Sequence, residues 1–166
     1  MIPTGILLIL LILLNFTIFT IRKETAMTIS FDDSLITGNN TIDSQHRELI
    51  DKVKTFVDAC ENGDAKVKAI KMLDYLEEYT IFHFDAEEKL MKDVSYPGLA
   101  NHHEKHEEFK KSISSLREFL DEIDGPNDQF MLAVKENVVE WLFGHIKTFD
   151  RSIAEFIFLT DHPQRL

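Results

Sequence analysis

Cysteine, glycine and proline are scarce in this sequence. Its 166 residues include one cysteine, Cys60, together with six glycines and four prolines. A single cysteine excludes an internal disulfide and is compatible with a reducing compartment. The shortage of glycine and proline leaves long stretches that nothing interrupts, which favours helices. Seven histidines and thirteen phenylalanines then indicate a helical domain with an aromatic-rich core.

Positive charge is also in short supply. Lysine and arginine total 18 against 29 aspartates and glutamates, so the net charge is −11. Residues 1–26 contain Arg22, Lys23 and Glu24 as their charged residues, a net of +1, and the rest of the chain therefore carries −12. A domain of this sign repels phosphates, which excludes nucleic acid as a partner.

The N-terminal stretch is hydrophobic and separate in character. No charge occurs before Arg22, and residues 6–14 are all isoleucine or leucine. A membrane span needs about 20 apolar residues, and the positive pair Arg22 and Lys23 would place the following domain in the cytoplasm. A cleavable signal peptide is disfavoured because no positive residue precedes the apolar run. Alternatively, Met27 is the true start and Met1 is a misassigned one.

Two segments are therefore expected. Residues 1–26 form either a membrane anchor, through residues 5–21, or a misassigned start. Residues 27–166 form a cytoplasmic domain that is soluble or anchored to the inner face of the membrane. This domain is long enough to bury one hydrophobic core.

Apolar side chains beyond the arm at residues 27–42 recur at spacings of three and four, the period of a helix. Asp43 is the expected N-cap of a first helix that ends near Gly63. Further helices are expected over about 65–93, 99–123 and 128–159, separated by breaker residues. Four long amphipathic helices with short links predict an all-α, up-down-up-down four-helix bundle preceded by an N-terminal arm.

Histidines and carboxylates interrupt the apolar face of each expected helix. A spacing of four places His83 above Glu87, and His102 above His106, on one helix face. One such pair would indicate no more than a solvated surface. Seven polar groups on buried faces would cost several kcal/mol each at the upper end, unless a metal cluster coordinates them. The predicted ligands are His46, His83, Glu87, His102, His106, His145 and Asp150.

Two histidines fall outside this pattern, and a third has an unusual spacing to its neighbouring carboxylate. His103 and His162 lack this placement and are expected at the surface. His145 and Asp150 are five residues apart, which puts Asp150 about 140° off the face of His145 in an ideal α-helix. Either Asp150 reaches sideways between two metal ions or the helix deviates locally, and the spacing leaves both open.

The ligand types narrow the choice of metal. Imidazole and carboxylate without thiolate suit iron, manganese or zinc, and seven ligands are too many for one tetrahedral zinc. Five histidines would supply five bonds, two bridging carboxylates four, and one oxo or hydroxo bridge two. Eleven of the twelve positions of two octahedral ions would then be filled, leaving one open for a small ligand.

These motifs resemble the hemerythrin family over about residues 30–160. The resemblance lies in residues 42–46, read Ile-Asp-Ser-Gln-His, in residues 83–88, read His-Phe-Asp-Ala-Glu-Glu, and in residues 141–146, read Trp-Leu-Phe-Gly-His-Ile. All seven predicted ligands occur in the family's order. Phe31 departs from the pattern, because the family usually has a tryptophan in this arm.

The resemblance implies how two iron ions would be held. His102, His106 and His145 would bind one ion, and His46 and His83 the other. Glu87 and Asp150 would bridge the two ions together with an oxo or hydroxo group. Dioxygen would bind to the ion that has two histidines.

The implied function is reversible dioxygen binding, for storage, transport or delivery, and not enzyme catalysis. Leu49, Trp141 and Leu142 lie within one turn of predicted ligands and are expected to line a dry, apolar oxygen pocket. The alternatives are a module that senses oxygen, redox state or nitric oxide, and a di-iron oxidase or peroxidase. The oxidases of the ferritin type use Glu-x-x-His pairs, which this sequence lacks.

Overall fold

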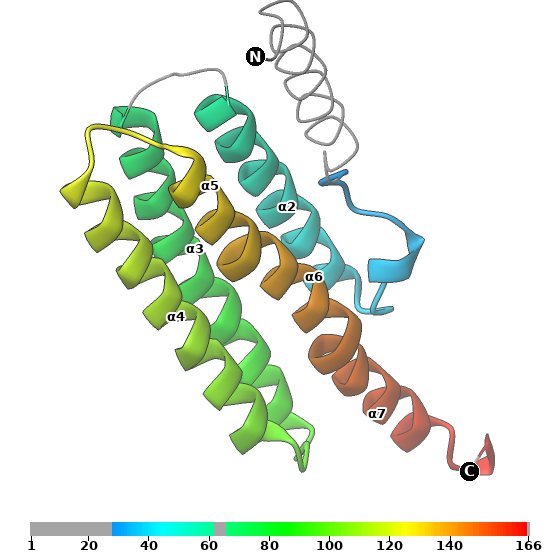
Figure 1. The fold of residues 1–166 in the computed structure, drawn as a ribbon. Coiled ribbons are helices and arrows are strands. Elements are labelled where there is room, and N and C mark those ends of the chain that lie inside the picture. The colour runs from blue at the N-terminus through cyan, green and yellow to red at the C-terminus, as the bar shows by residue number, and fades with distance from the viewer. Residues whose placement is uncertain (1–27, 62–65, 166) are drawn as a thin grey trace, which may run out of the picture.

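The computed structural model describes residues 28–61 and 66–165 (Figure 1). The predicted hydrophobic segment 1–26, with its proposed anchor at 5–21, lies outside the described residues. Within the two described ranges, no helix is both long enough and apolar enough to cross a membrane.

Helices make up nearly all of the described chain, and strands are absent from it. The first three long helices are α2 (Asn40–Glu61), α3 (Lys66–Asp93) and α4 (Leu99–Glu122). The fourth is one continuous path through five segments: α5 (Asp128–Val134), η2 (Lys135–Glu140), α6 (Trp141–His145), η3 (Ile146–Asp150) and α7 (Arg151–Asp161). Short 3₁₀ turns, η1 (Asp33–Leu35) and η4 (Pro163–Arg165), lie near the two ends.

The four helical paths pack side by side with alternating direction (Figure 1). Helix α3 packs against both α2 and α4, and α4 packs in turn against α5 and η2. The predicted up-down-up-down four-helix bundle is confirmed. The predicted boundaries of α3 and α4 agree with the observed ones to within one residue at each described end.

The start of α2 differs from the prediction. The helix begins at Asn40, three residues before the expected N-cap Asp43. The Asn39 side chain accepts hydrogen bonds from the backbone N–H groups of Thr41 and Ile42, at 3.0 and 3.2 Å, and so supplies the cap. Asn is as good an N-cap as Asp, so the sequence prediction of Asp43 was wrong by a few residues.

Asp43 instead connects the N-terminal arm to α2 through hydrogen bonds. Its carboxylate accepts hydrogen bonds from the N–H and the hydroxyl of Thr37, each at 2.8 Å, and from the N–H of Gly38 at 3.3 Å. Gly38 has φ +95°, a left-handed conformation that glycine adopts without strain. Arg151 at the start of α7 donates to the carbonyls of Ser34 and Ile36.

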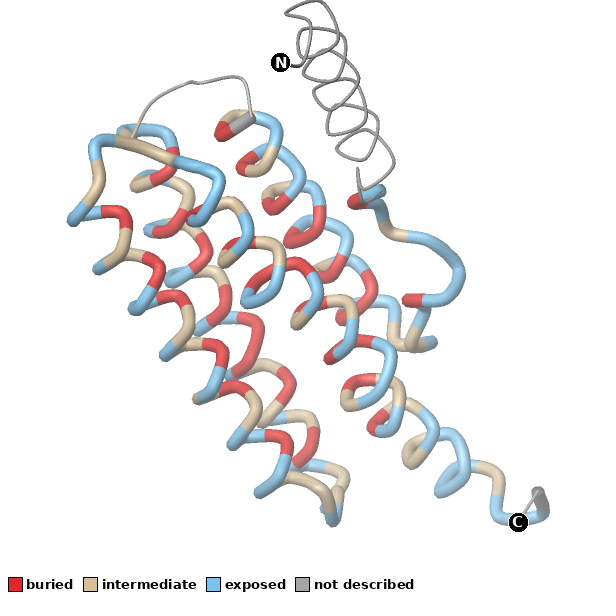
Figure 2. Tube along the Cα trace, viewed as in Figure 1, coloured by how far each residue is buried: buried red, intermediate tan, exposed pale blue. Residues whose placement is uncertain are grey.

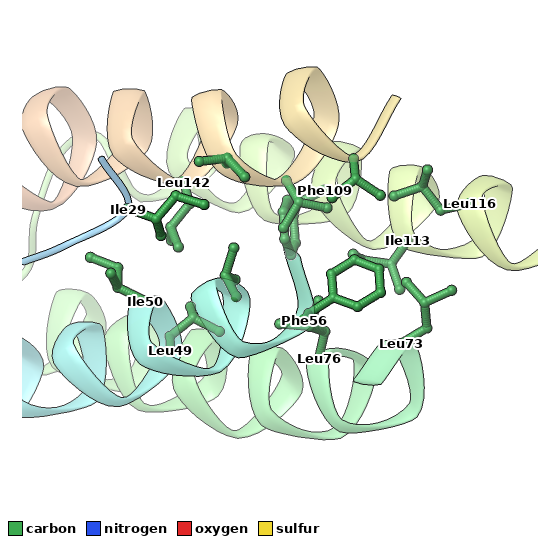
Figure 3. Close-up of a cluster of buried hydrophobic side chains, with 14 of the residues drawn as sticks. Ile29, Leu49, Ile50, Phe56, Leu73, Leu76, Phe109, Ile113, Leu116 and Leu142 are labelled. Atoms are coloured by element: carbon green, nitrogen blue, oxygen red, sulfur yellow. The ribbon is translucent and has the colours of Figure 1, made fainter. Parts of the chain in front are cut away.

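The apolar faces of the four paths meet in one continuous core. Buried residues follow the inner side of each helix (Figure 2). Aromatic and aliphatic side chains from α2, α3, α4 and the fourth path interdigitate there, as Figure 3 shows for Phe56, Leu76, Phe109 and Leu142. At about 25 cal/mol per Å² of buried apolar surface, this packing is the main force that holds the helices together.

Candidate metal centre

The structure brings all seven predicted ligand residues together inside the bundle. Each is buried, with at most 5% of its surface exposed. Helix α2 contributes His46, α3 contributes His83 and Glu87, and α4 contributes His102 and His106. The fourth path contributes His145 from α6 and Asp150 from η3. The cluster therefore requires all four helical paths.

A π-helical turn resolves the spacing of five between His145 and Asp150. Segment η3 is a single π turn, in which the N–H of Arg151 donates to the carbonyl of Ile146, five residues earlier. This wider turn brings Asp150 back to the face of His145, and the distance from Asp150 Oδ1 to His145 Nε2 is 3.1 Å. Of the two alternatives left open by the spacing, the local deviation of the helix is the one observed. Such turns are frequent at functional sites.

Glu87 lies between two groups of histidines. Its Oε1 is 3.5 Å from His83 Nε2 and 3.7 Å from His46 Nε2. Its Oε2 is 3.3 Å from His106 Nε2 and 3.6 Å from His102 Nε2. One carboxylate oxygen thus faces a two-histidine group and the other faces a second group.

Asp150 divides its oxygens in the same way. Its Oδ2 is 3.1 Å from His46 Nε2, and its Oδ1 is 3.3 Å from His102 Nε2 and 3.1 Å from His145 Nε2. The Nε2 atoms of His102 and His145 approach to 3.0 Å. Both carboxylates therefore span the same two groups, His46 with His83 on one side and His102, His106 and His145 on the other.

Hydrogen bonds alone do not satisfy this cluster. Every buried side-chain nitrogen or oxygen that lacks a hydrogen-bond partner in the described ranges belongs to five of its members. These are His46, Glu87, His102, His106 and Asp150. Their short contacts lack the direction that hydrogen bonds need, and each orphaned atom would cost about 1–3 kcal/mol. Coordination to cations would remove that cost. In two sets of cluster residues the ligand atoms lie within 4.8 Å of one another: Glu87 with His102, His106 and His145, and Glu87 with His46 and His83.

The charges in the cluster suit a cation. Burial favours the neutral form of each carboxyl, but the facing histidines outweigh it and hold the pKa of Glu87 and Asp150 well below the usual range. Burial also disfavours a charged His46, yet the carboxylates of Asp150 and Glu87 outweigh it and raise the pKa of that imidazole to about 9. Two anionic carboxylates among five imidazoles form a donor set of the kind that binds transition metals.

Aromatic rings stack on two of the histidines. The His145 ring lies between Trp141, at 4.4 Å and 12° between planes, and Phe149, at 5.2 Å and 8°. The Phe84 ring stacks on His106 at 3.7 Å between centroids. These rings restrict how each imidazole can rotate. Sequence reasoning missed Phe84 and Phe149, although each adjoins or lies one turn from a predicted ligand.

Of the three predicted oxygen-pocket residues, two are fully buried and one is half-buried. Leu49 and Leu142 are buried members of the core, one from α2 and one from α6 (Figure 3). Trp141 is half-buried and packs against His145, Phe84 and Phe109. The tryptophan therefore contacts the three-histidine side of the cluster.

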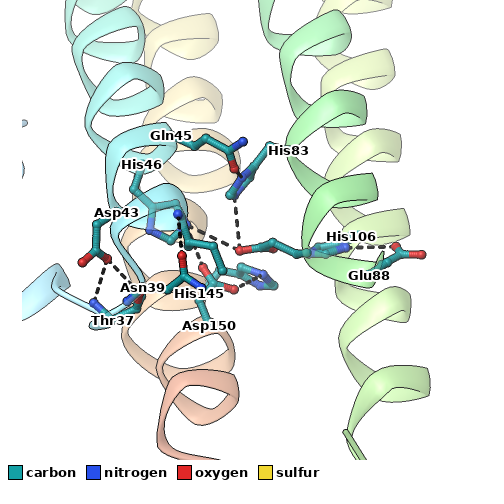
Figure 4. Close-up of polar contacts among 12 residues, drawn as sticks. Thr37, Asn39, Asp43, Gln45, His46, His83, Glu88, His106, His145 and Asp150 are labelled. Carbon is teal, nitrogen blue, oxygen red and sulfur yellow. Dashed lines mark hydrogen bonds and ion pairs between the residues drawn. The ribbon is translucent and has the colours of Figure 1, made fainter. Parts of the chain in front are cut away.

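Polar residues just outside the cluster contact the outward-facing nitrogens of two histidines. His83 Nδ1 lies 2.9 Å from the amide oxygen of Gln45, and His106 Nδ1 lies 3.1 Å from a carboxylate oxygen of Glu88 (Figure 4). His103 is half exposed at the surface, as predicted, and its Nδ1 lies 2.8 Å from the same Glu88 oxygen. Sequence reasoning gave Gln45 and Glu88 no role, although each directly adjoins a predicted ligand in the chain.

The fold and the cluster together define a class: an antiparallel four-helix bundle with histidines and carboxylates at its centre. Comparison with known proteins gives the same class. The sequence profile of the hemerythrin HHE cation binding domain matches residues 37–157. A bacteriohemerythrin from Pseudomonas aeruginosa is 28% identical over 127 residues, which cover 76% of this chain and 80% of that protein. A bacteriohemerythrin from Clostridium acetobutylicum is 30% identical, covering 74% and 96%.

Solved structures support the fold. A crystal structure of wild-type hemerythrin superposes with a TM-score of 0.67 at 23% identity, covering 78% of this chain and 97% of that one. Among sequence relatives, a hemerythrin-like protein from Naegleria gruberi is 26% identical over 121 residues, which cover 73% of this chain and 87% of that protein. This chain belongs to the hemerythrin family.

Proposed function

We propose that this protein binds dioxygen reversibly at a non-haem di-iron centre, and that it is a carrier or store and not an enzyme. The observation that carries the proposal is the division of the two carboxylates. Glu87 and Asp150 each direct one oxygen toward His46 and one toward His102. Such an arrangement suits two cations side by side with two shared carboxylate ligands.

The two groups would hold the irons unequally. His102, His106 and His145 would bind one ion, whereas His46 and His83 would bind the other, with Glu87 and Asp150 bridging both. Dioxygen would bind on the side of His46 and His83, where the chain offers one histidine fewer. When bound, the iron pair supplies the electrons that make dioxygen binding strong and reversible.

The chain's own residues would supply the rest. Burial of all seven ligands excludes bulk water from the pair, and a dry surrounding limits proton delivery to bound oxygen. Leu49 and Leu142 would form the apolar wall. Trp141 and Phe149 would hold His145 in place by stacking on its two faces.

An absorbance spectrum of the iron-loaded protein tests the proposal. The reduced protein is recorded without oxygen, then in air, and then again under argon. Charge-transfer bands of ferric iron that appear in air and disappear under argon would support a carrier. Bands that persist under argon would favour an oxidase, or a sensor whose response to oxygen is irreversible. The absence of any bands would exclude a di-iron oxygen site.

A further inference from the structure

The buried histidines differ in what their outer nitrogen contacts. His83 Nδ1 lies against Gln45, a neutral amide, whereas His106 Nδ1 lies against Glu88, a carboxylate. Among the residues that the structure describes, the Nδ1 atoms of His46 and His102 have no hydrogen-bond partner. Figure 4 shows the two outer contacts, Gln45 with His83 and Glu88 with His106. The two proposed iron sites are therefore unequal beyond their number of histidines.

Glu88 is held firmly in its position. Its side chain is 12% exposed, and one oxygen, Oε1, contacts the imidazoles of both His106 and His103. His103 approaches from the solvent side, one residue after the predicted ligand His102 on α4. Glu88 itself follows Glu87 on α3. The carboxylate thus lies between the surface and the cluster, and its Oε1 is shared by His103, at 2.8 Å, and His106, at 3.1 Å.

A carboxylate and an amide affect an imidazole differently. An ionised acceptor makes a hydrogen bond roughly twice as strong as a neutral one. By accepting from Nδ1–H, it fixes the tautomer in which Nε2 has a free lone pair, and it makes that nitrogen more basic toward a metal. His106 Nε2 is one of the orphaned atoms of the cluster. A more basic Nε2 stabilises a ferric ion more than a ferrous one.

We propose that Glu88 is a positioning residue that fixes His106 and makes the iron held by His102, His106 and His145 the harder of the two to reduce. The inference depends on the proposed function for the identity of the metal. In a half-reduced protein, the remaining ferric ion would then be the one on the His106 side. Gln45, which is neutral, would leave the His83 side easier to reduce.

A reductive titration of the iron-loaded protein tests this directly. Dithionite supplies the electrons, and each one-electron step converts one ferric ion to a ferrous ion. We expect Glu88→Gln to raise the lower of the two reduction potentials and to narrow the gap between them. The matched control is Glu78→Gln, which removes the same charge from an exposed position on α3. A shift in Glu88→Gln no larger than in the control would overturn the proposal.

Two further variants test whether the outer acceptor controls the reduction potentials, independently of any folding defect in Glu88→Gln. Glu88→Asp keeps the carboxylate and should restore much of the wild-type difference between the two reduction potentials. Gln45→Glu gives His83 a charged acceptor and should lower the potential on the His83 side, which would also narrow the gap. If Gln45→Glu leaves both potentials unchanged, the idea that the outer acceptor controls the iron is wrong.

Two measurements that need no iron separate this inference from the oxygen-binding proposal. Nitrogen-15 NMR of the metal-free protein should show His106 as the Nδ1–H tautomer, with a strongly hydrogen-bonded proton that weakens in Glu88→Gln. Zinc should also bind about ten-fold more weakly to Glu88→Gln than to Glu78→Gln. If the wild type fails to bind oxygen but these two results hold, the proposed function fails and the role of Glu88 stands. If neither result holds, the role of Glu88 fails.

Discussion

The carboxylate of Asp150 lies 3.1 Å from the imidazole of His145, although the two are five positions apart along one helical path. The π turn η3 makes this contact available, because its wider coil returns Asp150 to the same face. A single local irregularity therefore decides whether the fourth helical path contributes one side chain or two to the cluster.

Replacement of this aspartate should disrupt metal binding. Asp150→Asn keeps the volume of the side chain but removes the charge that faces His46, His102 and His145. We expect the metal content to fall from about two ions per chain to one or fewer. The loss of affinity should exceed the roughly 10–100-fold that loss of an outer partner costs. Metal analysis after dialysis measures it, and Asp161→Asn at the exposed end of α7 is the control. Full metal content in Asp150→Asn would mean that Asp150 is not a ligand.

The apolar wall of the proposed oxygen pocket can be tested at Leu142. Leu142→Asn would bring a polar group into the buried wall of the proposed pocket and would let water and protons reach it more readily. We expect oxidation of the oxygenated protein to quicken by at least about ten-fold, equivalent to roughly 1.4 kcal/mol in the barrier. The decay of the charge-transfer absorbance in air gives the rate. Leu132→Asn, at an exposed position of α5, should leave it unchanged. An unchanged rate in Leu142→Asn would remove that leucine from the pocket.

Removal of the metal should lower the stability of the whole bundle. A ligand at a thousand times its dissociation constant stabilises the folded state by about 4 kcal/mol. For a domain of this size, this corresponds to a fall in Tm on the order of 10 °C. Thermal unfolding with and without a chelator measures the difference. In Asp150→Asn the chelator should have much less effect. An equal effect in the two proteins would show that the chelator acts elsewhere.

The arm depends on the carboxylate of Asp43. Asp43→Ala removes three hydrogen bonds to Thr37 and Gly38, and we expect a loss of roughly 2–3 kcal/mol in the free energy of unfolding. Urea denaturation gives this value, and amide exchange of residues 34–38 should quicken at the same time. Asp33→Ala, which is exposed in η1, is the control. Slow exchange in Asp43→Ala would mean that Arg151 and the buried Leu35 suffice to hold the arm.

Two tyrosines should make stability depend on alkaline pH. Tyr75 and Tyr79 both donate a hydrogen bond to Glu48. Burial and then this carboxylate disfavour tyrosinate and raise the pKa of Tyr75 from 10.0 to about 12, and that of Tyr79 in the same direction. Because these pKa values are higher in the folded state, the stabilisation is complete below the unfolded pKa of about 10 and is lost as the pH rises toward 12.

The variant Glu48→Gln tests this pH dependence. The tyrosinate absorbance should shift to lower pH, and the loss of stability above pH 10 should become less steep. Glu78→Gln, on an exposed part of α3, should change neither. If Glu48→Gln titrates like the wild type, burial alone accounts for the raised pKa.

The sequence predicted the bundle and the gathering of seven polar residues because both follow from the period of the helix. His83 with Glu87, and His102 with His106, lie on one face wherever an α-helix forms. The π turn at η3 could not be chosen in advance, because a spacing of five fits either a sideways reach or a wider turn. The N-cap of α2 was predicted at the wrong residue, because Asn and Asp are equally suitable caps and the Asp43 carboxylate accepts from Thr37 and Gly38 instead. Glu88 was missed because its partners lie on another helix.

The spread of the cluster along the chain bears on how the protein matures. His46 is synthesised early and Asp150 late, with every other member between them. A growing polypeptide therefore offers an incomplete set of donors until the last helical path has emerged, and any ion captured earlier would be held loosely and exchanged. Under the proposed function, metal would therefore be loaded only after the bundle has assembled.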